Sequence, residues 1–333
     1  MIIPIQDEVL PEENYVVLSC QEDFEEFWLE GVSRTAKALP DEIIWKMEPH
    51  SFPVPQVRVF RVTLTMVDQT CLQGWYVCPI HASLSSTVPA LVRFHGYGSD
   101  KGTISHLLIW GLLGYAVLSM DVRGQSPESP DGRAHAAGSH GGWMTQGLAG
   151  PETYYYREVY LDAVAAVELL ARRPEIRAQK IGLFGDSQGA AIASAATALV
   201  AHYGPRFQFQ SYIAALSAAL PFLSNFAQGL KMDHRESPLA ELDVHMAERK
   251  EEVLRVLSYF DIMNFAPWIQ CPTLVALALK DQVCPRETVL PFYNNLGMED
   301  KLMALYPDHG HEPIDAHMDR RVMFFAQWLM AIS

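Results

Sequence analysis

Residues 181–196 read IGLFGDSQGAAIASAA, and this stretch decides the fold. Its first four residues form a short apolar run, which is typical of a strand buried in a parallel sheet. The residues after Gly189 are rich in alanine and predict a helix that packs closely on that sheet. Between the two lies a G-x-S-x-G pattern, at a sharp strand-to-helix turn that would expose its serine above the sheet. Ser187 is therefore the candidate nucleophile.

Strand-like and helix-like segments alternate on both sides of this stretch. The expected strands are 57–67, 72–78, 90–94, 115–120, 181–184, 212–216, 274–279 and 302–306. Helical spacing marks 156–171, the segment after Ser187, and 324–330. Such alternation predicts an α/β fold with a mostly parallel central sheet and helices on both faces. Together with the serine turn, it favours the α/β-hydrolase fold.

The length of 333 residues is compatible with one large α/β domain, and we expect a single domain over 1–333. Residues 1–45, with aromatic side chains in an acidic setting, predict a helical N-terminal extension. Residues 221–267 interrupt the alternation with a long charged helical stretch at 241–257. We expect this segment to be a helical insertion over the strand ends, near the active site.

The composition limits the possible partners. A net charge of -14 argues against nucleic acid, because phosphates recruit basic proteins. No apolar stretch approaches the length of a membrane span, and no targeting segment is visible. Five cysteines without metal-site spacing predict reduced thiols, a cytoplasmic location and no metal site. They are Cys20, Cys71, Cys78, Cys271 and Cys284.

A serine hydroxyl needs a base that removes its proton. In the α/β-hydrolase order, serine is followed by an acid and then by a histidine in the loop after the last strand. His311 lies in such a loop, within PDHGHE at 307–312, so it is the candidate base. His309 is the nearby alternative, which we interpret as a solvated loop residue.

The acid should follow a strand between the serine and the histidine, and it should hold the imidazole in the productive tautomer. Asp281 follows the predicted strand 274–279 and meets both conditions. Asp308 is the rival, but it shares the loop of His311. Asp186 is adjacent to Ser187, where its side chain should diverge. Cys284 lies close to Asp281 and is interpreted as a structural thiol.

Two backbone N–H groups should hold the negatively charged oxygen that forms during acyl transfer. The residue after the nucleophile, Gln188, supplies one of them, and the loop after strand 90–94 supplies the other. That loop reads His95-Gly96-Tyr97-Gly98, and we assign the second donor to Tyr97. His95 is expected to shape the loop.

Several motifs together resemble one carbohydrate esterase family, which contains acetyl xylan esterases and cephalosporin-C deacetylases. Its members share an Arg-Gly-Gln triplet, a Gly-x-Ser-Gln-Gly turn and a late His-Glu pair. These motifs occur here as Arg123-Gly124-Gln125, Gly185-Asp186-Ser187-Gln188-Gly189 and His311-Glu312. The stretches 144–163 and 281–285, and the N-terminal segments 10–13 and 23–28, are similar to the family as well.

The resemblance implies a cofactor-free serine esterase that deacetylates small acetylated sugars and cephalosporin C through an acyl-enzyme. It also implies an intracellular homohexamer. Arg123, Gln125 and Glu312 would then support the active site without reacting. This sequence departs from the family at Ala190, where a second glycine is common, and in the segments 126–130 and 221–233. These departures bear on the acyl-group and leaving-group preference.

Two other interpretations fit parts of the pattern. A peptidase of the prolyl-oligopeptidase type shares the fold and the order of the three residues, but the sequence shows no propeller repeat. Other short-chain carboxylesterases share the same chemistry. A non-catalytic binding protein with this fold is the alternative from a different class, and the complete set of Ser187, Asp281 and His311 argues against it.

Overall fold

The computed structural model describes residues 16–39, 41–133 and 142–330. A nine-stranded sheet forms the centre of this described part, in the order β1-β2-β3-β5-β4-β6-β7-β8-β9. The strands are β1 (Ile44–His50), β2 (Val57–Thr65), β3 (Cys71–Pro79), β4 (Val88–Phe94), β5 (Ala116–Met120), β6 (Ile176–Asp186), β7 (Ile213–Ala219), β8 (Thr273–Ala278) and β9 (Lys301–Tyr306). The pairs β1–β2, β2–β3 and β3–β5 are antiparallel. The pairs β5–β4, β4–β6, β6–β7, β7–β8 and β8–β9 are parallel.

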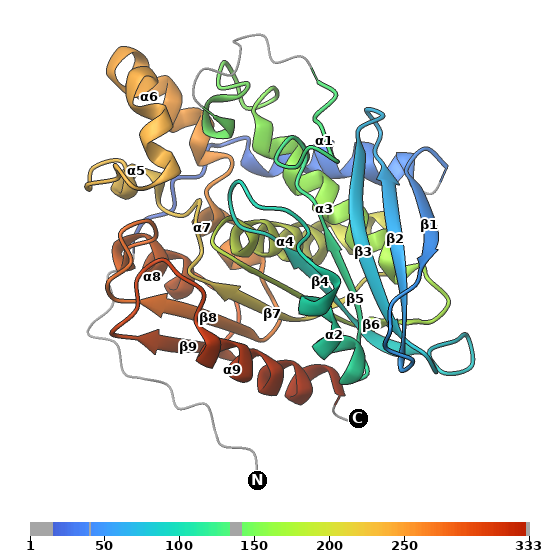
Figure 1. The fold of residues 1–333 in the computed structure, drawn as a ribbon. Helices are drawn as coiled ribbons and strands as arrows, with labels where there is room; N and C mark the ends of the chain where they lie inside the picture. The colour runs from blue at the N-terminus through green and yellow to red at the C-terminus, as the bar shows by residue number, and fades with distance from the viewer. Residues whose placement is uncertain (1–15, 40, 134–141, 331–333) are drawn as a thin grey trace.

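Helices cover both faces of the sheet, as the sequence predicts, with α2 and α9 on one face and α1, α3 and α4 on the other (Figure 1). The helices are α1 (Phe24–Ala38), α2 (Ile104–Leu112), α3 (Tyr155–Ala171), α4 (Gln188–Phe207), α5 (Phe226–Gly229), α6 (Asp243–Ser258), α7 (Ile262–Phe265), α8 (Arg286–Asn294) and α9 (Asp315–Phe325). Short 3₁₀ helices are η1 (Trp143–Thr145), η2 (Pro238–Leu242) and η3 (Ala266–Trp268), and η4 (Ala326–Met330) is a π-helix. The predicted α/β-hydrolase fold is confirmed.

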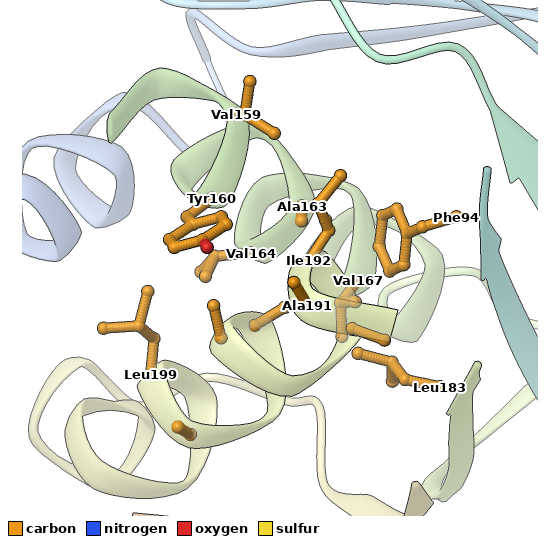
Figure 2. Packing of buried hydrophobic residues seen from close by; sticks show 14 of the residues in the cluster. Phe94, Val159, Tyr160, Ala163, Val164, Val167, Leu183, Ala191, Ile192 and Leu199 are labelled. Carbon is orange, nitrogen blue, oxygen red and sulfur yellow. The ribbon is translucent and has the colours of Figure 1, made fainter. Parts of the chain in front are cut away.

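Helices α3 and α4 pack against each other through buried side chains, as Figure 2 shows. Ala163 and Val167 of α3 lie beside Ala191 of α4, and all three side chains are buried. Phe94 and Leu183, from β4 and β6, complete this packing from the sheet. Small alanine side chains allow the helix axis to approach the sheet, so the start of α4 is held firmly against the strand ends.

The N-terminal helix α1 buries one face, because its large apolar residues recur at helical spacing. Trp28 is fully buried, and its indole N–H donates to the carbonyl oxygen of Tyr259 at 3.0 Å. The predicted helical extension over 1–45 is wrong at its end, because the helix stops at Ala38 and β1 begins at Ile44. Residues 44–48 alternate between exposed and half-buried side chains, and 44–50 pair with β2, which stabilises a strand there. Residues 1–15 of the extension lie outside the described residues.

The expected insertion at 221–267 contains α5, η2, α6 and α7 and connects β7 to β8. The strand β1 is the one described strand that the sequence reading missed, and α9 begins nine residues before the predicted 324–330. Among the residues with a described structure, the helices are too short or too polar to cross a bilayer.

Candidate active site

Ser187 occupies the sharp turn between β6 and α4 with a backbone φ of 56°. Non-glycine residues rarely adopt this conformation, and the surrounding structure must hold it in place. The Ser187 N–H donates to the carbonyl oxygen of Ala219 at 2.9 Å, and the Ser187 carbonyl oxygen accepts from Phe222 at 3.2 Å. The end of β7 therefore fixes the strained turn.

Two glycines make this turn possible because they leave room for the backbone. A methyl group on Gly189 would lie 2.1 Å from the carbonyl oxygen of Phe94, and one on Gly185 would lie 2.3 Å from the backbone of Gly189. Both distances are far shorter than a van der Waals contact. The turn therefore requires glycine at both positions, and it places the first turn of α4 directly beside the end of β4.

The structure brings the three predicted catalytic side chains into one hydrogen-bonded line. The imidazole Nε2 of His311 lies 2.9 Å from the Oγ of Ser187, and its Nδ1 lies 2.8 Å from an Oδ2 oxygen of Asp281. The Asp281 side chain is fully buried. Its other oxygen accepts the backbone N–H groups of Val283 and Cys284, each at 2.8 Å. These bonds fix the carboxylate so that it orients the imidazole toward the serine.

The rival residues have other partners. His309 lies 2.9 Å from a carboxylate oxygen of Glu312, and Asp308 accepts from Lys280 at 3.0 Å on the surface. His95 donates from Nδ1 to the carbonyl oxygen of Gly96, and its Nε2 accepts the N–H of Val122 at 2.8 Å. Burial lowers the pKa of His95, so the ring is neutral and suited to both bonds.

The side chains of Gln188 and Gln125 tie the two predicted oxyanion donors together. Their amide groups exchange two hydrogen bonds, at 2.7 and 3.0 Å. Gln125 also accepts the N–H of Gly98 at 3.0 Å, directly after Tyr97. A buried amide pair with both ends satisfied has a defined orientation. Gln125 thus holds the loop of Tyr97 against the start of α4.

Arg123 lies behind this pair, with its side chain fully buried. It donates two hydrogen bonds to Asp162, both at 2.7 Å, and one to Asp68 at 2.6 Å. Burial opposes its charge, but the carboxylates outweigh burial and raise the pKa of Arg123. The Tyr155 hydroxyl donates to the Arg123 carbonyl oxygen. Arg123 therefore anchors the loop that carries Gln125, and does not reach the reacting atoms.

Glu241 is a site residue that the sequence reading missed. It comes from η2 in the 221–267 insertion, and it accepts the hydroxyl proton of Tyr97 at 2.7 Å and the N–H of Met144 at 3.0 Å. Burial raises the pKa of Tyr97, so the phenol stays protonated and donates. No local pattern could have indicated this contact, because 144 residues separate the two partners.

Three residues of the site, Asp281, Cys284 and His311, each have an atom that could bind a metal ion. These three atoms all lie within 4.8 Å of one another. The carboxylate is already hydrogen-bonded to the imidazole, and the imidazole is hydrogen-bonded to Ser187. Burial raises the pKa of the Cys284 thiol well above its ordinary value, which disfavours the thiolate that a metal or a nucleophilic role needs. We therefore interpret Cys284 as a buried packing residue.

A cavity of about 310 Å³ opens beside Ser187 and His311. Leu220, after β7, and Ala276 in β8 line it on the sheet side, and residues 312–315 and α9 line it opposite. This volume is within the range of small-molecule pockets. The line of three side chains therefore faces a space large enough for a ligand.

The sheet, the strained serine turn after β6 and the loops after β8 and β9 define a member of the α/β-hydrolase class. The sequence model for acetyl xylan esterase (AXE1) matches residues 13–329. The chain therefore belongs to the acetyl xylan esterase family, whose members are carboxylic ester hydrolases.

Solved structures agree with this assignment. The acetyl xylan esterase from Paenibacillus sp. R4 is 32% identical, with a TM-score of 0.86 over 95% of this chain and 98% of that one. Acetyl xylan esterase 1 from Thermoanaerobacterium sp. JW/SL YS485 is 28% identical, with a TM-score of 0.85 over 94% and 96%. The acetyl esterase Axe7A of Xylanibacter ruminicola is 28% identical over 185 residues, which are 54% of this chain. The match spans 39% of the length of that curated relative.

Proposed function

We propose that this protein is a serine esterase that removes acetyl groups from small acetylated sugars. The observation that carries the proposal is the hydrogen-bonded line of Ser187, His311 and Asp281 at the edge of a ligand-sized cavity. Membership of the acetyl xylan esterase family supports acetyl esters as the substrate class. Cephalosporin C, an acetyl ester on a different alcohol, is a second proposed substrate.

The proposed reaction has two steps. His311 removes the hydroxyl proton of Ser187 as its oxygen attacks the acetyl carbonyl carbon, and the N–H groups of Tyr97 and Gln188 hold the oxyanion. His311 then protonates the departing alcohol, which leaves an acetyl-enzyme. Water attacks this ester with His311 as base, and acetate leaves. Asp281 stabilises the imidazolium in both steps.

Rates on a substrate panel test the proposal. We expect acetyl esters of one alcohol to be hydrolysed faster than the propionyl and butyryl esters, and peptide amides to be inert. A fluorophosphonate probe should label the wild-type protein at Ser187. Faster hydrolysis of peptide amides than of acetyl esters would favour the peptidase, and failure to react with the probe would contradict an activated serine.

Glu241→Ala should lower the kcat for an acetyl ester by about tenfold, with a smaller change in KM. The physical reason is that Tyr97 loses the acceptor that fixes its loop, and a displaced oxyanion donor costs up to about 10²- to 10³-fold. Glu241→Gln keeps an oxygen acceptor for the Tyr97 hydroxyl and should retain more of the rate. Equal rates for wild type and both variants, at unchanged melting temperature, would remove Glu241 from the positioning of Tyr97.

We also propose a reducing cytoplasmic compartment and a hexameric assembly, without nucleic acid or membrane partners. The five free thiols and the net charge of -14 support the compartment and the lack of affinity for nucleic acid. The hexamer is supported by the family resemblance. Cell fractionation and sedimentation velocity are the measurements that check the compartment and the assembly.

A further inference from the structure

The cavity beside Ser187 carries polar side chains that the proposed mechanism does not use. They are Asp186, directly before the nucleophile, and His317 and Arg321 from α9. Tyr97 and Gln188, which supply the proposed oxyanion donors, are not among the residues that line the cavity, whereas His311 is. Its lining runs from Gly96 and Ser187 past His311 to α9, so the cavity extends from the nucleophile toward and beyond the imidazole.

Asp186 presents a fixed hydrogen-bond acceptor to this cavity. One carboxylate oxygen accepts from the Nη2 of Arg321 at 2.5 Å, and the Nε of Arg321 donates to the Ser217 hydroxyl at 3.1 Å. Within the part of the chain that the structure describes, the second oxygen of Asp186 makes no hydrogen bond. The Asp186 side chain is 57% exposed, while that of Arg321 is 6% exposed. The buried guanidinium therefore holds the carboxylate in one orientation and leaves one oxygen open.

His317 presents a second polar atom. Its residue is 3% exposed, and its Nδ1 lies 3.1 Å from the hydroxyl oxygen of Tyr306. Its buried Nε2 has no hydrogen-bond partner among the described residues. His317 lines the cavity, and folded proteins rarely leave such an atom unsatisfied, so Nε2 needs a partner that the described side chains do not supply. Burial lowers the pKa of His317 to about 3, so the ring is neutral.

The position of the imidazole decides which part of an ester enters the cavity. In acyl transfer, His311 gives its proton to the oxygen of the departing alcohol, so that alcohol must lie on the imidazole side. An acetyl methyl group needs only a small part of a space of about 310 Å³. The cavity therefore fits the alcohol and not the acetyl group.

The charge of the cavity decides between kinds of alcohol. Three acidic residues, Asp186, Glu312 and Asp315, line the cavity, and Arg321 is the one arginine among its lining residues. The guanidinium of Arg321 is already paired with Asp186. An anionic alcohol would meet uncompensated negative charge, whereas neutral hydroxyl groups can donate to the open oxygen of Asp186.

We propose that Asp186 and His317 form a leaving-group subsite that selects neutral alcohols with hydroxyl groups beside the ester bond over anionic alcohols. This inference rests on the proposed esterase function and adds to it the residues that choose the alcohol. It ranks the neutral acetylated sugars above cephalosporin C, which carries carboxylates.

The test compares Asp186→Asn with wild type on three acetyl esters: an acetylated methyl xyloside, phenyl acetate and cephalosporin C. Asparagine keeps an oxygen for Arg321 and turns a donor amide toward the cavity in place of the acceptor. We expect kcat/KM for the xyloside to fall about tenfold more than for phenyl acetate. For cephalosporin C we expect a rise relative to phenyl acetate, because the local negative charge is removed. His317→Leu should likewise affect the xyloside more than phenyl acetate.

Melting temperatures of both variants separate a lost contact from a lost fold. A parallel fall on all three esters would overturn the proposal, because Asp186 would then act on Ser187 itself. Equal kcat/KM for wild type and Asp186→Asn on every ester would also overturn it. The same variants are also compared on phenyl acetate, phenyl propionate and phenyl butyrate, where an effect that follows acyl-chain length would assign the cavity to the acyl group instead. Hydrolysis of phenyl acetate by the wild-type protein tests the esterase function separately, so a failure of one hypothesis is distinguishable from a failure of the other.

Discussion

Ser187→Ala should lower kcat for an acetyl ester by roughly 10⁴- to 10⁶-fold, because the covalent step loses its nucleophile while the oxyanion donors remain. Alanine keeps the Cβ atom and therefore the backbone geometry, with its φ of 56°. The melting temperature should change little. The measurement is the rate of acetate release together with a thermal melt of the same preparation.

Ser194→Ala is the matched control for this variant. Ser194 lies in α4 as well, is buried, and donates to the carbonyl oxygen of Ala190 at 2.7 Å, with no contact to His311 among its bonds. This substitution should leave kcat near the wild-type value. Turnover by Ser187→Ala within tenfold of wild type would show that the serine is not the nucleophile.

Asp281→Asn should lower kcat by about 10⁴-fold, because an asparagine amide can stabilise the wrong tautomer of His311 and cannot compensate the imidazolium charge. The buried Asp281 carboxylate accepts hydrogen bonds from Val283, Cys284 and His311, and these bonds fix its orientation in the native protein. An asparagine can retain the two backbone bonds through its oxygen. The measurement is kcat on a soluble acetyl ester, with circular dichroism to show that the fold persists.

Asp308→Asn is the control for the acid. Asp308 is an exposed carboxylate in the same loop as His311, and it is paired with Lys280 on the surface. Its loss should change kcat less than twofold, because exposed ion pairs contribute little. A large effect at Asp308 with an intact rate for Asp281→Asn would reassign the acid.

The parts of the fold that the sequence predicts well are those encoded within one segment. The strand 181–184, the glycines of the turn and the alanine-rich helix are neighbours in the chain, so one stretch predicts the geometry around Ser187. The order of serine, acid and histidine then indicated Asp281 and His311, which the structure places in hydrogen-bonding contact. Their catalytic roles remain predictions until the variants are measured.

The features that sequence reading missed depend on contacts between distant segments. Strand β1 has a proline and two exposed charges, and only its pairing with β2 makes it a strand. The side chain of Asp186 meets Arg321 from α9, 135 residues away, a partner that the sequence pattern does not indicate. Glu241 likewise reaches Tyr97 across 144 residues. Residue type and local spacing carry no signal for such pairs.

The strained backbone of Ser187 has a consequence for the heat resistance of this protein. Unfolding relieves the unfavourable φ of Ser187, so this residue lowers the free energy of unfolding. Glycine at position 187 would give a more stable but inactive protein. A search for greater thermostability alone would therefore favour replacing the nucleophile. Serine in this conformation serves turnover at the expense of stability, so thermostabilising changes have to come from elsewhere in the chain.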